Sequence, residues 1–265
     1  MQVRPPAVAG PFYPADPEAL RALIHTCLRD AAPSSGPATK AIIAPHAGYV
    51  YSGPIAASAY ARLIPLAGQI RRVVLAGPCH RVAVRGLALP SSTAFATPLG
   101  TVPLDQAGVA IAAALPGVHV FDATHTREHS LEVHLPFLQA VLGDFELVPL
   151  VVGGVAAEQV AAVLDALWGG PETLVVISSD LSHFLPYAEA RRVDAATCTA
   201  IEARDGQRLG PHDACGHVPV SGLLALARQR HLTIETLDLR SSGDTAGDRD
   251  RVVGYGAWAL HEVAT

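Results

Sequence analysis

Histidine and aspartate residues follow three apolar segments of the sequence that are rich in β-branched residues. His46 comes directly after AIIAP, His80 follows VVLAGPC, and Asp180 and His183 lie at the end of LVVISSDLSH. Imidazole and carboxylate groups bind transition metals and move protons near neutral pH. If the three segments are neighbouring strands, these side chains meet in one cleft. Taken singly, each histidine reads as a loop residue, and Asp180 reads equally well as a helix cap.

A cysteine lies between alanine and glycine in PHDACGHVPV, residues 211–220. Cys215 is a candidate metal ligand or nucleophile, with a buried structural thiol as the alternative. Gly216 lets the backbone pass close beside such a site, and His217 either lines the pocket or caps the following helix. A disulfide is not favoured, because the four cysteines (positions 27, 79, 198 and 215) form no CxxC and the N-terminus has no export signal.

The segment REHSLEVHLPFL contains a second group of histidines and acids. His129 and His134 are five residues apart, about 140° around a helix, so they do not chelate from one face. His129 and Glu132 would share a helical face, and Glu128 or Glu132 could orient a ligating histidine. The alternative is a helix start without any function, with Ser130 as its N-cap.

The elements that must position these residues alternate along the chain. Short apolar runs predict buried strands at 41–45, 73–78, 147–154, 174–180 and 252–260. Alanine- and leucine-rich stretches predict helices at 17–30, 54–67, 104–115, 130–142, 156–168, 187–204 and 219–230. Residues 84–104 carry many turn residues and predict short extra strands or a hairpin. The pattern predicts one α/β domain over 1–265, with helices flanking a central mixed, mostly parallel sheet.

Composition excludes several classes of protein. Charged residues make up 16% of the chain, the net charge is −5, and no basic block suggests nucleic-acid binding. The sequence has no run of about 18 apolar residues, so no membrane span is predicted. A cytoplasmic protein is expected. There is no P-loop, no GxGxxG after the first strand and no GxSxG, so a nucleotide enzyme of the familiar kinds is not expected.

Six motifs in order then carry a resemblance to a known family: PHAGYVYSG, GPCH, EHSLEVHLPFL, SSDLSH, ACGHVPV and VVGYGAWAL. Over about residues 4–260 the chain resembles the Memo-like family, whose bacterial and archaeal members are called AmmeMemoRadiSam system protein B. That family is similar in fold to the class III extradiol dioxygenases of the LigB type. The resemblance therefore implies a single α/β domain with a non-haem metal site.

Carried over motif by motif, the resemblance implies that His46, His80 and Cys215 are the metal ligands. Asp180 and His183 would line the same cleft, with His183 as the acid/base. Other residues are expected in the pocket or around the ligands: His129, Glu132, Cys79, His217 and Tyr49. The chain departs from many relatives by Cys79 in place of serine, by Arg81 in place of a second histidine, and by His134 where prokaryotic relatives often have glutamine.

Two imidazoles and a thiolate suit Fe(II), Cu or Zn rather than Mg or Ca. The resemblance implies one metal ion, Fe(II) foremost, and a dioxygenase-like oxidoreductase acting on a small, aromatic substrate. One alternative is a metal-binding or interaction module without turnover, whose expected partners are an AmmeMemo-type domain protein and a radical SAM protein. Another is a zinc hydrolase that uses metal-bound water.

Overall fold

A nine-stranded mixed sheet forms the centre of the protein in a computed structural model that describes residues 2–31 and 36–263. The strand order is β10-β12-β2-β9-β3-β8-β4-β7, and β11 pairs with β12. The strands are β2 (Ala41–Ala44), β3 (Arg72–Pro78), β4 (Leu87–Leu89), β7 (Val118–Val120), β8 (Glu146–Val152), β9 (Thr173–Ser178), β10 (His183–Leu185), β11 (Thr233–Ser241) and β12 (Val252–His261). The four central strands β2, β9, β3 and β8 run parallel, and antiparallel pairing begins at β12 and β4.

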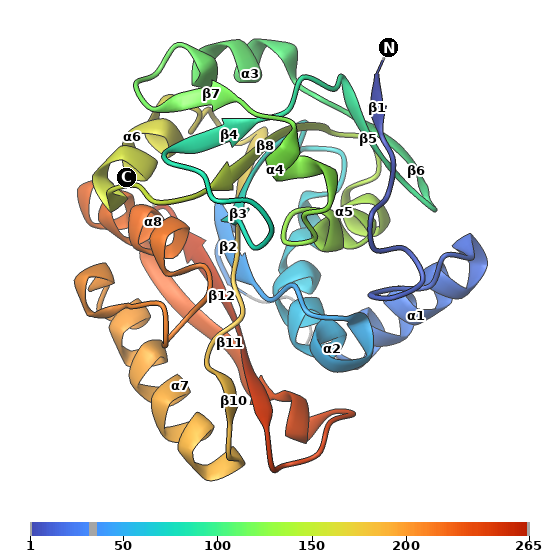
Figure 1. The fold of residues 1–265 in the computed structure, drawn as a ribbon, viewed down its shortest axis with the longest axis vertical. Helices are drawn as coiled ribbons and strands as arrows, with labels where there is room; N and C mark the ends of the chain where they lie inside the picture. The colour runs from blue at the N-terminus through green and yellow to red at the C-terminus, as the bar shows by residue number, and fades with distance from the viewer. Residues whose placement is uncertain (1, 32–35, 264–265) are drawn as a thin grey trace.

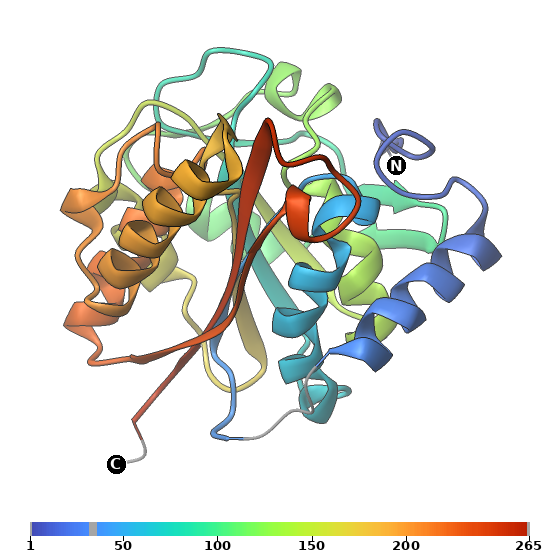
Figure 2. The same ribbon diagram turned by 90° about the horizontal axis from the view of Figure 1, so that it is seen from below.

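Helices cover both faces of the sheet (Figures 1 and 2). On one face lie α1 (Pro17–Asp30), α2 (Tyr49–Tyr60) and α5 (Leu135–Leu142), and on the other lie α3 (Gln106–Ala113), α6 (Ala157–Ala166), α7 (Tyr187–Glu202) and α8 (His217–Gln229). Side chains alternate between two cores: Ile42 and Ala44 face α1 and α2, while Ala41 and Ile43 face α7 and α8. A sheet buried on both faces explains the uniformly apolar strands.

The remaining elements are short. A three-stranded sheet combines β1 (Val3–Arg4) with the hairpin of β5 (Ala94–Thr97) and β6 (Gly100–Pro103). The short helices are α4 (Ala123–Thr126), η1 (Ala61–Leu66), η2 (Glu132–His134), η3 (Gly206–Arg208) and η4 (Ser242–Asp244). Among the described residues, no helix combines the length and apolar character that a membrane crossing requires.

The predicted α/β sandwich with a mixed sheet is confirmed, including extra strands and a hairpin within 84–104. Two segments differ from the prediction. Helix α2 begins at Tyr49, so Pro54 lies inside the helix instead of starting it. Strand β11 is not among the predicted strands, because residues 233–241 alternate apolar and polar side chains and lack the uniformly apolar run that indicates a buried strand.

Candidate metal centre

The carboxyl ends of three parallel neighbours, β2, β9 and β3, meet at one edge of the sheet. Ala44 pairs with Ser178, and Ala76 pairs with Ile177, so the loops that follow carry His46, Asp180 and His80 into one space. This is the convergence expected at the strand ends of an α/β sheet.

Cys215 reaches the same place from the loop before α8. Its backbone N–H donates to the carbonyl of Asp180 (3.3 Å), and the next N–H, of Gly216, donates to Ser179 Oγ (2.9 Å). The ligand atoms of His46, His80 and Cys215 all lie within 4.8 Å of one another. Two imidazoles and one sulfur, from three separate loops, thus surround one small volume.

The orientation of His46 is fixed by Ser178. Ser178 Oγ donates its proton to the carbonyl of Ser130 (2.7 Å), so it accepts a hydrogen bond from Nδ1 of His46 (2.6 Å). The Nε2 lone pair is therefore left free, and Nε2 lies 3.5 Å from Cys215 Sγ. Burial, followed by the neighbouring His80 and His129, holds the pKa of His46 well below its usual value, so the ring is neutral and able to ligate.

Glu128 fixes the orientation of the His80 ring, as Ser178 fixes that of His46. Its Oε1 accepts from His80 Nδ1 (2.8 Å), its Oε2 accepts from the His80 backbone N–H (2.6 Å), and it also accepts from the N–H groups of His129 and Ser130. Burial alone would raise the pKa of Glu128, but the hydrogen bond and charge of His80 outweigh it and lower the pKa to about 2. The carboxylate stays ionised and directs Nε2 of His80 toward the centre.

The thiol of Cys215 is protonated in the metal-free protein. Burial, reinforced by the carboxylate of Asp180, raises its pKa to about 12. A divalent or monovalent metal ion would displace that proton, because coordination stabilises the thiolate directly. The donor set fits a transition metal: two imidazoles whose Nδ1 atoms are engaged by Ser178 and Glu128, and one thiol able to become a thiolate.

Asp180 and His183 lie in the segment that follows β9, Asp180 in the loop and His183 at the start of β10. Asp180 Oδ1 accepts from the His46 backbone N–H (2.8 Å), and Oδ2 lies 3.9 Å from His46 Nε2. Burial raises the pKa of Asp180 to about 6. His183 is exposed on β10 with Nδ1 on the carbonyl of Leu181 (2.8 Å), and the next residue, Phe184, has a left-handed φ of 59°. The chain continues into β10 after Asp180, so this residue does not cap a helix.

His129 adds a third imidazole to the cluster. Its ring stacks on His80 with centroids 4.6 Å apart and meets His46 edge-on at 5.3 Å. His80, Glu128 and His129 form a second group whose ligand atoms are close enough to share an ion. Burial foremost lowers the pKa of His129 to about 4, so this ring is also neutral. The ring of Phe12 packs on its other side at 4.8 Å.

The expected helical face of His129 and Glu132 does not exist, because α5 begins only at Leu135 after a 3-10 turn. Ser130 is not an N-cap either, and its hydroxyl donates to the carbonyl of Pro78 (2.7 Å). Glu132 is fully buried and anchors the N-terminal segment, accepting from Arg4, Tyr13 and the N–H groups of residues 7 and 8. It orients no ligand.

Four more residues considered from the sequence lie outside the cluster. Cys79 donates its thiol proton to the carbonyl of Val82, and Tyr49 is a core residue whose hydroxyl donates to Val133. His217 starts α8 and lines a separate pocket between α6 and α8. His134 is buried against the Tyr60 hydroxyl. These contacts hold each side chain elsewhere, so none joins the grouped ligand atoms of His46, His80 and Cys215.

Ser178 is the site residue that sequence reasoning missed. Its segment SSD is typical of a helix N-cap, yet β10 follows β9 there and no helix begins. The available signal was its place near the end of the strand predicted over 174–180, two residues before Asp180.

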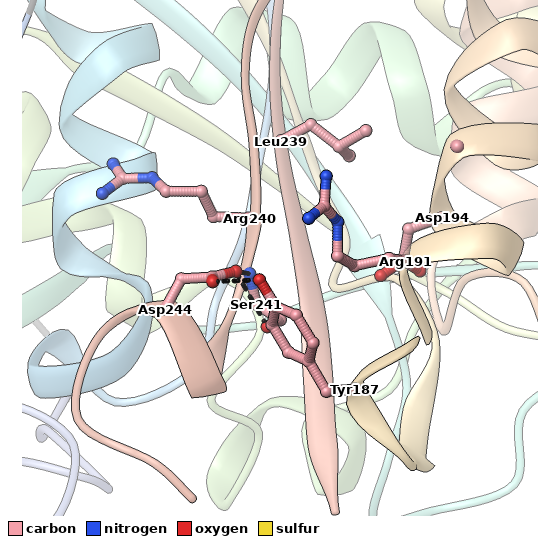
Figure 3. Close-up of a pocket in the computed structure, with 8 residues that line it drawn as sticks. Tyr187, Arg191, Asp194, Leu239, Arg240, Ser241 and Asp244 are labelled. Carbon is pink, nitrogen blue, oxygen red and sulfur yellow. Dashed lines mark hydrogen bonds between the residues drawn. The ribbon is translucent and has the colours of Figure 1, made fainter. Parts of the chain in front are cut away.

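A separate pocket of about 270 Å³ lies between α7 and β11 (Figure 3). Tyr187 donates to Asp244 there, and the guanidinium of Arg191 points into the space while that of Arg240 points away. Asp194, which borders the pocket, accepts from the backbone N–H of Ser182 (3.0 Å). Asp194 thus connects this pocket to the segment that leads into His183, because it binds the backbone N–H of Ser182.

The chain is similar to known proteins over almost its whole length. The model of the Memo-like protein family matches residues 4–259. A MEMO1 family protein of Methanothermobacter thermautotrophicus is 36% identical over 273 residues, covering 96% of this chain and 98% of the relative. A MEMO1 family protein of Aquifex aeolicus is 36% identical over 270 residues, covering 96% and 98%.

Among solved structures, an uncharacterized protein of Escherichia coli K12 matches with a TM-score of 0.50 at 14% identity, covering 82% of this chain and 99% of that one. This likeness concerns the fold. The sequence matches carry the assignment, because they span the six motifs and the strand ends that form the cluster. The chain belongs to the Memo-like family.

Proposed function

We propose that this protein binds one transition-metal ion through His46 Nε2, His80 Nε2 and Cys215 Sγ, and that the bound ion serves an oxidoreductase reaction on a small, aromatic substrate. The observation that carries the proposal is the convergence of one ligand atom from each of these three residues within 4.8 Å. Both imidazoles have their Nδ1 atoms engaged by Ser178 and Glu128, which leaves Nε2 as the ligand atom of each.

The donor set favours a borderline or soft ion. Imidazole and thiolate suit iron, copper and zinc, whereas Mg and Ca require oxygen ligands. Iron(II) is the first choice, in line with the resemblance to extradiol dioxygenases. When bound, a redox-active ion would supply one-electron chemistry to a substrate held beside it.

The residues around the ligands provide groups for proton transfer. His183 is accessible and has its Nδ1 on a backbone carbonyl, so its Nε2 is free to take or give a proton. Asp180 fixes the loop of His46 through the backbone N–H. His183 is therefore proposed as the acid/base, and Asp180 as the group that positions the ligand loop.

The test is metal analysis of protein purified without oxygen. Wild type is expected to hold about one equivalent of iron, and His46→Ala and Cys215→Ser are expected to lose it. Cys198→Ser is the matched control for thiol loss, because Cys198 is buried on α7 and bonds to Thr236 and Glu202, away from the ligand atoms. Full metal retention in both ligand variants would overturn the site.

Oxygen consumption separates the reaction from metal binding alone. Iron-loaded wild type is expected to consume O₂ with a member of a catechol-like panel, and His183→Ala is expected to keep its iron while losing turnover. Iron retained without any O₂ consumption across the panel would favour the metal-binding module. Zinc as the native metal, with activity that needs no oxygen, would favour the hydrolase.

A further inference from the structure

A pocket of about 800 Å³ lies next to the metal centre and contains two arginines. Arg81 directly follows the ligand His80, and Arg127 directly precedes Glu128, the residue that orients His80. The pocket is thus bordered by the two loops that hold one ligand. Val8 closes it from the N-terminal segment, whose backbone is tied to Glu132.

The guanidinium groups of Arg81 and Arg127 have no hydrogen bond or ion pair with any residue in the described ranges 2–31 and 36–263. Several arginines elsewhere are paired with acids, such as Arg4 with Glu132, Arg72 with Asp105, Arg230 with Asp165 and Arg240 with Asp238. Arg81 and Arg127 are both exposed, so their guanidinium groups can reach a ligand that enters the pocket from solvent.

The acids near this pocket are already engaged. Glu128 faces inward, where it accepts from His80 and three backbone N–H groups. Asp122 accepts from the backbone and hydroxyl of Ser91, which hold its pKa below the usual value. Neither carboxylate forms an ion pair with Arg81 or Arg127, so both guanidiniums are available to an anionic ligand.

The rest of the wall is mostly apolar, formed by Ala7, Val8, Val82 and Ala123, together with Thr126, whose hydroxyl donates to the carbonyl of Asp122. An apolar wall with a few placed polar groups is typical of a small-molecule site. Arginine forks bind carboxylate and phosphate oxygens in pairs, with more geometric specificity than a point charge.

We propose that this pocket binds the oxyanion of a small organic substrate, a carboxylate or phosphate group, through Arg81 and Arg127. The inference rests on the proposed metal centre and names the substrate class that would reach it: an anionic compound whose apolar part lies between the arginines and the imidazole cluster. The pocket volume of about 800 Å³ is large enough for a single aromatic ring with its charged group.

Isothermal titration with three probes tests this inference: benzoate, phenyl phosphate and the neutral benzamide. The proteins are wild type, Arg81→Gln, Arg127→Gln and the double variant, each metal-free and iron-loaded. Arg71→Gln is the matched control, because Arg71 is exposed and precedes β3 at the opposite end from His80. Benzoate or phenyl phosphate is expected to bind wild type more tightly than benzamide, and more weakly at high salt.

Each single variant is expected to weaken oxyanion binding about threefold and the double variant about tenfold, with benzamide unchanged. Equal binding of charged and neutral probes, no binding of any probe, or an equal loss in Arg71→Gln would overturn the inference. Its failure is distinguishable from failure of the metal site. The arginine variants are expected to keep their iron, whereas His46→Ala is expected to lose iron and still bind the oxyanion.

Discussion

Ser178 Oγ lies 2.6 Å from His46 Nδ1, and its hydroxyl donates a hydrogen bond to the carbonyl of Ser130. These two hydrogen bonds are compatible with one tautomer of His46, which carries its proton on Nδ1 and has a free lone pair on Nε2. The hydroxyl therefore decides which ring nitrogen faces Cys215, although it contributes no ligand itself.

Ser178→Ala is expected to weaken metal binding about 10- to 100-fold, because the buried ring loses the group that fixes its tautomer and orientation. The measurement is competition with a chromophoric chelator on metal-free protein. Ser58→Ala is the control, since Ser58 lies on α2 and its Oγ donates to Asp238 on β11, outside the cluster. An unchanged affinity for Ser178→Ala would show that packing alone holds the ring.

The loop of Cys215 depends on a close backbone approach. A Cβ on Gly216 would lie 2.5 Å from the carbonyl oxygen of Ser178 and 2.7 Å from Ser179 Cβ. Gly216→Ala must therefore push the loop away from β9, at a cost of about 1–3 kcal/mol. Both the free energy of unfolding and the metal affinity are expected to decrease.

Gly154→Ala is the matched control for Gly216→Ala, because a Cβ there would meet its nearest atom at 3.9 Å. Urea denaturation and chelator competition check both variants. If Gly216→Ala keeps the wild-type unfolding midpoint and metal affinity, the close approach is not what holds Cys215 in place.

Much of the fold could be predicted from short stretches of sequence. The strands that carry the cluster were recognisable because burial on both faces makes β2, β3 and β9 apolar throughout. Strand β11 could not be recognised by a uniformly apolar run, because one of its faces is partly exposed. The histidines at the strand ends followed from the architecture, and the resemblance added Cys215.

The partners of the site residues could not be predicted in this way. His46 bonds to Ser178 across 132 residues, and Arg4 bonds to Glu132 across 128. Glu128 and Glu132 are equally acidic and lie in one motif, but only their packing decides that one orients His80 and the other anchors the N-terminal segment. Sequence spacing carries no information on such pairings.

Tyr13 ties the N-terminal segment to the protein through Glu132. Its hydroxyl donates to Glu132 Oε1 (2.6 Å), and both side chains are buried. Tyr13→Phe is expected to lower the free energy of unfolding by about 1.5–3 kcal/mol, because the lost hydrogen bond has a charged acceptor. Urea denaturation measures the change. Tyr51→Phe, at a residue 39% exposed, is the control; equal unfolding midpoints for the two variants would contradict the anchoring role.

His134 makes stability depend on pH. Burial lowers its pKa to about 3, from an ordinary value of about 6.5. Between these values the unfolded chain binds a proton that the folded protein does not, so the free energy of unfolding falls as the pH decreases. Well below pH 6.5 this residue contributes about 1.4 kcal/mol per pH unit.

His134→Gln removes this titration and keeps a side-chain amide that can bond to the Tyr60 hydroxyl. The free energy of unfolding of the metal-free variant is expected to fall less steeply between pH 6 and 5, by roughly 1 kcal/mol over that unit. Urea denaturation at a series of pH values measures the slope, and His25→Gln, at an exposed position on α1, is the control. The same slope in wild type and His134→Gln would mean that the buried ring accepts a proton in the folded protein, against the desolvation that surrounds it.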